Sequence, residues 1–125
     1  MKKKILIVDD DPGLLTLLDR RLKANGYEVV SASDGKEAIE KTKQTQPDMI
    51  IMDVMMAPMN GYQACREIKN NPRFAKTPIM LLTARGTESD KFWGTESGAD
   101  VYVTKPYEPK ELLQIIDKMI KDQHG

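Results

Sequence analysis

Residues 5–11 read ILIVDDD, a run of four apolar residues that ends directly in three carboxylates. The apolar half is typical of a strand buried on both faces. The acidic half is costly, because two carboxylates about 5 Å apart repel each other by roughly 3 kcal/mol at an effective dielectric constant of about 20. Asp11 has a local explanation, since Asp is a favoured N-cap and the following Pro12 suits the first position of a helix. Asp9 and Asp10 have no such local reason, so the reason for their charge lies elsewhere in the chain.

Strand-like and helix-like segments alternate along the whole chain. Apolar runs predict five strands, over residues 4–8, 27–32, 49–52, 79–82 and 101–104. Amphipathic periodicity and helix caps, among them a capping box at Asp34 and Glu37, predict five helices. The first helix begins at Pro12 and ends near Gly26, and the next three cover 35–44, 61–70 and 87–97. The last helix carries an apolar stripe on one face, made of Leu112, Ile115, Ile116, Met119 and Ile120. Apolar strands separated by amphipathic helices indicate an α/β fold with a parallel sheet between two layers of helices, and residues 1–125 are predicted to form one domain.

The composition excludes several classes of function. Nineteen basic and nineteen acidic side chains cancel, so nothing favours direct binding to nucleic acid. Cys65 is the one cysteine, which excludes a disulfide framework and is explained as a small core residue. His124, the one histidine, lies next to the end of the sequence, so a histidine base is not expected. No apolar run approaches the roughly 20 residues that span a bilayer, and no signal-peptide pattern opens the chain, so no membrane and a cytoplasmic location are expected.

Polar side chains follow four of the five predicted strands, at the point where each strand ends: Asp9 and Asp10, Asp53, Thr83, and Lys105. In open parallel sheets, sites form beyond the carboxyl ends of the strands. Three carboxylates suit Mg²⁺, which prefers oxygen ligands and keeps coordination positions free for a phosphoryl group. Lys105 and Thr83 would hold further phosphoryl oxygens. Asp53 is the predicted nucleophile, because it ends a central strand and a carboxylate can form an acyl phosphate.

Several short motifs carry a resemblance to a known family. They are VDDDP (8–12), IIMDVMM (50–56), MNGY (59–62), LLTA (81–84), GAD (98–100) and VTKPY (103–107). With these motifs the chain resembles the receiver domain of two-component response regulators over nearly all of its length. The resemblance implies a flavodoxin-like, doubly wound (βα)5 fold with strand order 2-1-3-4-5. The KFWG segment (91–94) followed by GAD is also similar to the single-domain receivers of chemosensory systems.

The same resemblance assigns a phosphorylation site. It implies that Asp53 accepts a phosphoryl group from a sensor histidine kinase or a histidine phosphotransfer protein. Asp10 and Asp53 would bind Mg²⁺ directly, and Mn²⁺ could substitute. Asp9 would bind the ion through water, and the backbone carbonyl of Met55 would be a further ligand. The activity implied is self-catalysed phosphotransfer and autodephosphorylation only, so the chain is not expected to be an enzyme in the ordinary sense.

The resemblance also describes a switch. Lys105 and Thr83 would bind the phosphoryl group, and Tyr102 would rotate inward as Thr83 moves toward that group. The peptide bond between Lys105 and Pro106 would be cis. The face built from the fourth helix, the last strand and the fifth helix would then change shape. Its partner would be a downstream effector protein or a missing output domain, and a phosphorylation-dependent dimer is left open.

The loop after Asp53 departs from the family pattern. Pro58 stands one position away from the usual proline, and Asn60 replaces an aspartate; because Asn60 can still cap the next helix, little functional loss is expected. Met55 has no polar side-chain group to orient an attacking water, and Arg85 is long and cationic. Slow self-dephosphorylation is therefore our hypothesis, because hydrolysis needs a positioned water.

Segment 85–98 is the expected moving part, because it lacks a strong apolar stripe; its Phe92 and Trp93 are either core anchors or a patch that faces a partner. Three other functions would require residues that this sequence lacks or would lose the acidic set. An aspartyl-phosphate hydrolase of the haloacid dehalogenase type needs a second Asp where Met55 stands. A flavin-binding protein needs a phosphate-cradling loop where residues 9–11 are acidic. A degenerate receiver that only docks partners is disfavoured by the intact acidic set.

Overall fold

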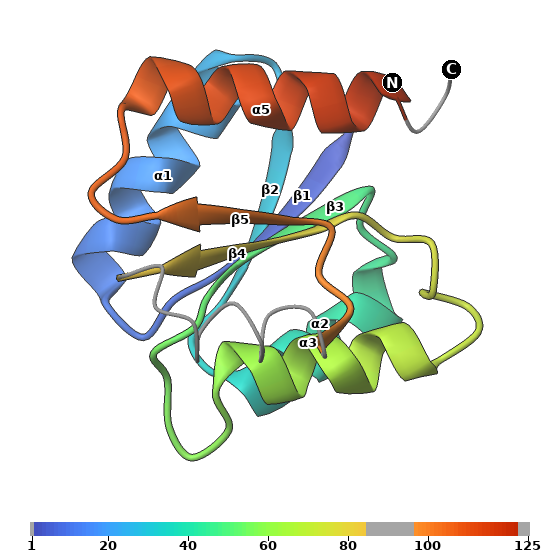
Figure 1. Ribbon diagram of the computed structural model, residues 1–125. Helices are drawn as coiled ribbons and strands as arrows, with labels where there is room; N and C mark the ends of the chain where they lie inside the picture. The colour runs from blue at the N-terminus through green and yellow to red at the C-terminus, as the bar shows by residue number, and fades with distance from the viewer. Residues whose placement is uncertain (1, 85–96, 123–125) are drawn as a thin grey trace.

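The computed structural model describes residues 2–84 and 97–122, and at its centre lies a five-stranded parallel sheet (Figure 1). The strands lie in the order β2-β1-β3-β4-β5, which confirms the predicted fold class and strand order. The strands are β1 (Lys4–Val8), β2 (Glu28–Ala32), β3 (Met49–Asp53), β4 (Ile79–Thr83) and β5 (Val101–Thr104). The helices of the described residues are α1 (Pro12–Ala24), α2 (Gly35–Thr45), α3 (Gly61–Asn70) and α5 (Pro109–Asp122).

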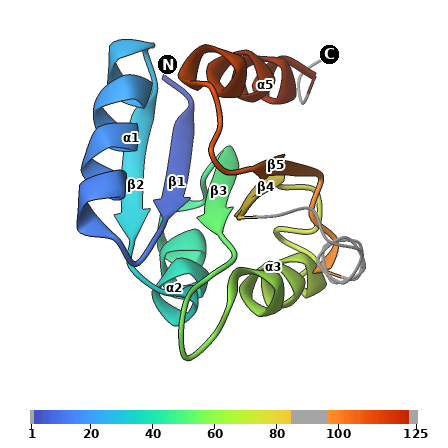
Figure 2. The ribbon, with the colours of Figure 1, turned by 60° about the vertical axis from the view of Figure 1, so that its left-hand side comes forward.

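Helices cover both faces of this sheet. α1 and α5 lie on one face, and α2 and α3 lie on the other (Figures 1 and 2). Alternate residues of a strand point to opposite faces, so Leu6 of β1 packs in the core beneath α2 and α3, and Ile7 packs in the core beneath α1 and α5. Every residue of β3 and β4 is buried. The two cores therefore hold the central strands rigidly and fix the edge at which they end.

Side-chain hydrogen bonds cap the N-termini of α2 and α3 in different ways. The side chain of Asp34 accepts a hydrogen bond from the backbone N–H of Glu37 at 2.8 Å, but the Glu37 carboxylate accepts from the Ser33 hydroxyl at 3.2 Å. The predicted capping box at α2 is thus present only as an aspartate cap. A complete capping box begins α3 instead: the Asn60 side chain accepts from the backbone N–H of Gln63, and the Gln63 side chain accepts from the backbone N–H of Asn60, both at 2.9 Å.

Some predictions fall on residues outside the described ranges. These are the fourth predicted helix apart from its last residue, the positions of Arg85, Phe92 and Trp93, and the position of His124. Cys65 is described, and its complete burial confirms that it is a core residue. Among the described residues, no helix is both long enough and apolar enough to cross a membrane.

Candidate functional site

The sheet brings the three predicted carboxylates together at its carboxyl edge. β1 and β3 are neighbours, with Val8 paired to Met52, so the residues that follow, Asp9 and Asp53, stand beside each other. Asp9 is 7% exposed and Asp53 is 5% exposed, whereas Asp10 lies open to solvent. One carboxylate oxygen from each residue lies within 4.8 Å of the other two. Asp9 and Asp10 of the ILIVDDD stretch therefore belong to a cluster that Asp53 of another strand completes.

Asp11, the third acid of that stretch, has a different role. Its side chain accepts hydrogen bonds from the backbone N–H groups of Gly13 at 2.9 Å and Leu14 at 3.4 Å, which confirms that it caps α1. The backbone N–H of Asp11 donates to Oδ1 of Asp9 at 2.9 Å. The start of α1 thus holds one side of the Asp9 carboxylate and leaves the other side facing the pocket.

The predicted cation and hydroxyl lie at the same edge. Nζ of Lys105 lies 2.9 Å from Oδ1 of Asp53 and 3.6 Å from Oδ2 of Asp9. The backbone N–H of Lys105 donates to the carbonyl of Thr83 at 2.6 Å, which joins the ends of β4 and β5. Thr83 itself is 7% exposed at the end of β4. The peptide bond between Lys105 and Pro106 is cis, as the resemblance implies, and the bond between Ala57 and Pro58 is also cis.

The charges in this pocket are not balanced. Burial raises the pKa of Asp9, and the charges of Asp53 and Asp10 raise it further against the opposing effects of the Asp11 N–H and Lys105. Burial alone would lower the pKa of Lys105, but its hydrogen bond to Asp53 and the charges of Asp53 and Asp9 outweigh this, so its pKa is raised. The site thus holds three carboxylates and one lysine, and a hard divalent cation would offset the excess negative charge.

The loop after Asp53 holds the backbone of this residue in place. The carbonyl of Val54 accepts hydrogen bonds from the N–H groups of Met56 at 3.0 Å and Gly61 at 2.9 Å. Gly61 packs so closely that a Cβ added there would lie 2.4 Å from the carbonyl oxygen of Asp53. Sequence reasoning placed Gly61 at the start of a helix and missed this contact; the one available signal was a glycine directly after a helix cap.

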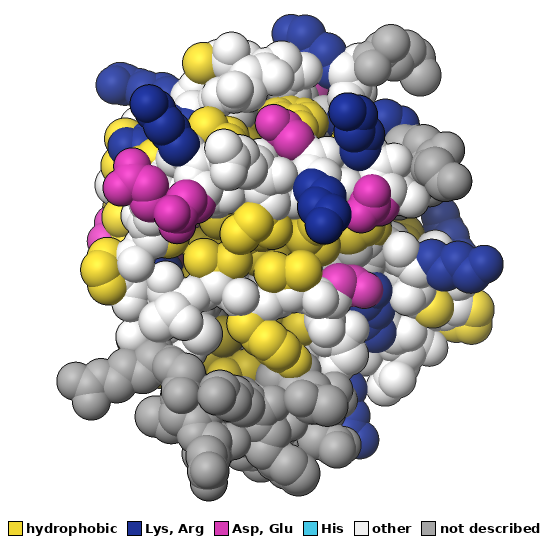
Figure 3. Space-filling view, turned by 45° about the horizontal axis from the view of Figure 1, so that its top comes forward, with side chains coloured by type: hydrophobic (Ala, Val, Ile, Leu, Met, Phe, Trp, Pro, Cys, Tyr) yellow, Lys and Arg dark blue, Asp and Glu magenta, His cyan; other side chains and the backbone are white. Residues whose placement is uncertain are grey.

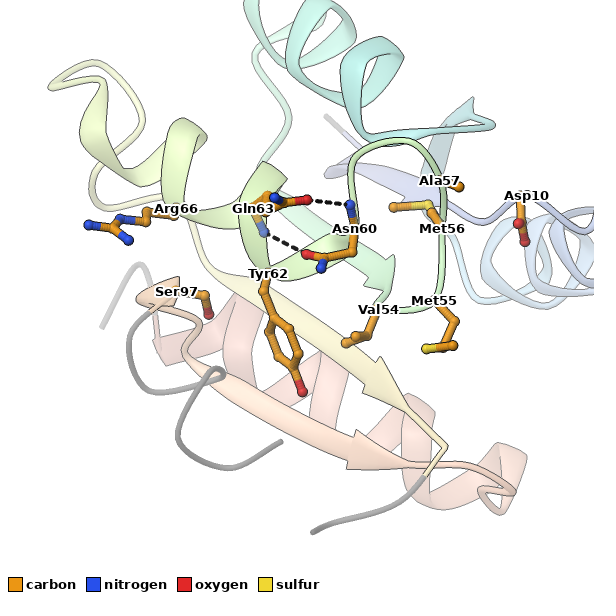
Figure 4. Close-up of a pocket in the computed structure, with 10 residues that line it drawn as sticks. All are labelled: Asp10, Val54, Met55, Met56, Ala57, Asn60, Tyr62, Gln63, Arg66 and Ser97. Atoms are coloured by element: carbon orange, nitrogen blue, oxygen red, sulfur yellow. Dashed lines mark hydrogen bonds between the residues drawn. The ribbon is translucent and has the colours of Figure 1, made fainter. Parts of the chain in front are cut away.

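A cavity of about 760 Å³ opens beside the acidic pocket, and the sequence did not predict it. Figure 4 shows its lining, with Asp10 and Met55 drawn toward one end and Arg66 and Ser97 toward the other. Tyr62 and Val54 of the buried core form part of its wall.

Tyr102, the predicted switch residue, does not join the acidic cluster. It lies on β5 opposite Leu81 and is 38% exposed, two residues before the position opposite Thr83. Its role as a switch residue stays a prediction.

Comparison with known proteins places this geometry in a family. The family model described as response regulator receiver domain matches residues 5–117. The chain belongs to the response regulator receiver domain family. Receiver domains act in two-component signalling, where they interact with histidine kinases and downstream effectors, and they typically bind Mg²⁺ at an acidic cluster. The cluster of Asp9, Asp10 and Asp53 fits such an ion, because it offers three carboxylate oxygens at mutually close distances.

Individual receivers resemble this one closely. The alkaline phosphatase synthesis transcriptional regulatory protein PhoP of Bacillus subtilis is 44% identical over 112 residues, which are 90% of this chain and 46% of that protein. The chain thus spans about half the length of the curated relatives it matches. The chemotaxis response regulator CheY4 of Vibrio cholerae is 32% identical, with a TM-score of 0.89 over 95% of this chain and 99% of that one. The receiver domain of the sensor histidine kinase PA1611 of Pseudomonas aeruginosa, solved with magnesium in its active-site cleft, is 30% identical, with a TM-score of 0.89 over 97% of this chain and 99% of that one.

Proposed function

We propose that this receiver domain carries a phosphoryl group on Asp53, received from a phosphohistidine of a sensor kinase or phosphotransfer protein. The observation that carries the proposal is the placement of a buried carboxylate 2.9 Å from a lysine ammonium and beside two further acids. The magnesium reported in the PA1611 receiver supports the same use of the acidic cluster here. The chain transfers a group to itself and does not turn over a separate substrate.

The residues divide the work of phosphotransfer. Asp10, Asp53 and the backbone carbonyl of Met55 would hold Mg²⁺ directly, with Asp9 acting through water. The ion, when bound, would neutralise charge on the phosphoryl oxygens. A lone pair of the Asp53 carboxylate forms the new O–P bond as the N–P bond to the donor imidazole breaks, and the bonding electrons return to that nitrogen. Lys105 stabilises a second phosphoryl oxygen as a point charge.

The transferred phosphoryl group then changes the positions of Thr83 and Tyr102. The phosphoryl group carries nearly two negative charges, which draw the Thr83 hydroxyl toward Asp53 and free space for Tyr102 to turn inward. Figure 3 shows the face that carries α5 and β5, where hydrophobic side chains form a band across the middle, between charged groups. β5 contributes the exposed Tyr102 and the half-buried Val101 and Val103 to this side of the domain. A downstream effector, an output domain or a second copy would read the change on this face.

The lifetime of the phosphorylated state follows from the residue two positions after the acceptor. Met55 is exposed and carries no polar side-chain group, so no side chain at this position orients a water for attack on the acyl phosphate. We expect slow autodephosphorylation, over minutes or longer rather than seconds.

Intact mass spectrometry tests the proposal. Incubation with Mg²⁺ and acetyl phosphate should add a phosphoryl group of roughly 80 Da to the protein. Asp53→Asn should gain nothing, whereas the matched variant Asp19→Asn, which removes a carboxylate from the surface of α1, should gain the group as the parent does. No adduct on the parent protein would favour a docking module without phosphorylation. Rapid consumption of donor with no adduct would favour a hydrolase.

A further inference from the structure

Met55 differs from most methionines of the described chain in its exposure. Its side chain is 70% exposed, whereas four others are less than 8% exposed: Met49, Met52, Met56 and Met80. The cause is a tight turn. Because the N–H of Met56 donates to the carbonyl of Val54 at 3.0 Å, Met55 is the central residue of a three-residue turn. Its two neighbours are both buried, so the side chain of Met55 is directed outward.

This exposed thioether lies at the mouth of the acidic pocket. Met55 lines the 760 Å³ cavity together with Asp10, whose carboxylate belongs to the three-acid cluster. Figure 4 shows the two side chains toward the same end of that cavity. A change in the polarity of Met55 would therefore alter the position of the water that approaches Asp53.

We propose that Met55 is a site of reversible oxidation to methionine sulfoxide, and that the sulfoxide shortens the lifetime of the phosphoryl group on Asp53. The oxidant is a hydroperoxide. A lone pair of the Met55 sulfur attacks the outer peroxide oxygen, and the S–O bond forms as the O–O bond breaks. The hydroxide or alkoxide that leaves takes up the proton of the transferred hydroxyl and becomes water or an alcohol. The sulfur is oxidised by two electrons and the peroxide is reduced by two. A methionine sulfoxide reductase, which draws its electrons from thiols, reverses the step.

The effect on lifetime comes from the new oxygen. A thioether is a weak hydrogen-bond acceptor, so it leaves the neighbouring water without a preferred orientation. A sulfoxide oxygen is polar and accepts strongly. At the mouth of the pocket it would hold a water close to the phosphoryl group and speed hydrolysis of the acyl phosphate. This second half of the proposal rests on the phosphorylation of Asp53 proposed above, whereas the selective oxidation of Met55 does not.

The first experiment identifies the oxidised residue. The folded protein is treated with hydrogen peroxide, and its peptides are examined for a gain of about 16 Da on each methionine. Met55 should be modified first, ahead of the half-buried Met59 and Met119. Preferential oxidation of either of these, with Met55 unmodified, would overturn the proposal whatever the protein does with phosphate.

The second experiment follows phosphoryl loss after removal of the donor. The oxidised protein should lose the adduct at least about threefold faster than before oxidation, and reductase treatment should restore the original rate. Met55→Leu, compared with itself before and after peroxide, should show no change, whereas Met119→Leu should remain sensitive. Equal decay rates before and after complete oxidation of Met55 would overturn the proposal and leave the proposed function intact. Absence of any adduct on the unoxidised protein would instead refute the proposed function, and the claim for lifetime would fall with it.

Discussion

Replacing Asp9 by Asn should stabilise this domain when no divalent cation is present. At an effective dielectric constant of about 20, an Asp53 charge within 4.8 Å repels Asp9 by at least about 3.5 kcal/mol, and the Lys105 ammonium 3.6 Å away attracts it by about 4.6 kcal/mol. Asp10 is exposed, so its repulsion is screened to about 1 kcal/mol. The charge interactions of Asp9 therefore nearly cancel, and the cost of burying its carboxylate is left without compensation.

The size of the gain follows from what Asn keeps and what it removes. A fully buried ion costs several kcal/mol after relaxation, but Asp9 stands at the rim of the sheet. Asn can still accept the hydrogen bond from the Asp11 N–H, so that contact is preserved. We expect the free energy of unfolding to rise by about 1–2 kcal/mol. Because burial raises the pKa of Asp9, the native state binds more protons than the unfolded state between the ordinary and the raised pKa. The parent protein therefore loses stability as the pH rises through this window, and the advantage of the variant appears there.

Urea unfolding followed by circular dichroism, at constant low ionic strength, measures this difference. With EDTA, Asp9→Asn should unfold at a higher urea concentration than the parent. With Mg²⁺ at 100 times its dissociation constant, the parent should gain about 2.7 kcal/mol and the variant less, because it has lost one acidic group around the ion. As a control, Asp19→Asn breaks only the surface ion pair with Lys23. We expect it to lower the free energy of unfolding by less than about 1 kcal/mol, by the same amount with Mg²⁺ and with EDTA. A variant less stable than the parent in EDTA would refute the electrostatic account of this pocket.

Three further predictions concern α3. Gly61→Ala should lower the free energy of unfolding by about 3 kcal/mol in urea titrations, because its Cβ would lie 2.4 Å from the carbonyl oxygen of Asp53; a loss below about 1 kcal/mol would contradict the close approach. Asn60→Ala should lower the free energy of unfolding by about 1 kcal/mol in the same assay, because it removes the side-chain oxygen that accepts the hydrogen bond from the Gln63 N–H. An unchanged midpoint would contradict the capping box. Burial raises the pKa of Cys65 to about 11, so iodoacetamide at pH 8 should label the folded protein far more slowly than the protein in urea, and equal rates would place the thiol at the surface.

The sheet was predictable because its signal is local and repeated. Each strand is a short apolar run, and the helices between them carry apolar stripes or caps, so only a parallel order with two helical layers buries every run. The positions of Asp9, Asp53, Thr83 and Lys105 followed from the same logic, since each stands where a strand ends. The strand order came from the family resemblance, because periodicity alone does not say which strands are neighbours.

Other features were not predictable because they depend on contacts between distant segments. The burial that separates Asp9 from Asp10 is one, since adjacent carboxylates look alike in a sequence. The packing of Gly61 against the Asp53 carbonyl is another, and it depends on how the loop between them folds back. At α2 the pattern of Asp34 and Glu37 predicted a reciprocal cap, but the Glu37 carboxylate accepts a hydrogen bond from the Ser33 hydroxyl instead. Local patterns name the groups that compete for a hydrogen bond, and the tertiary structure decides between them.

The ILIVDDD stretch joins the stability of the fold to the chemistry of the site. Its apolar half places β1 in the centre of the sheet, next to β3, and that neighbourhood forces Asp9 against Asp53. Lys105 offsets most of the resulting repulsion on Asp9, so the cost that remains is that of burying its carboxylate. The metal-free pocket is therefore held under electrostatic stress by the same packing that stabilises the domain. Added positive charge should stabilise the domain, and relief of this stress by a cation can be measured as a shift in unfolding before any phosphoryl donor is supplied.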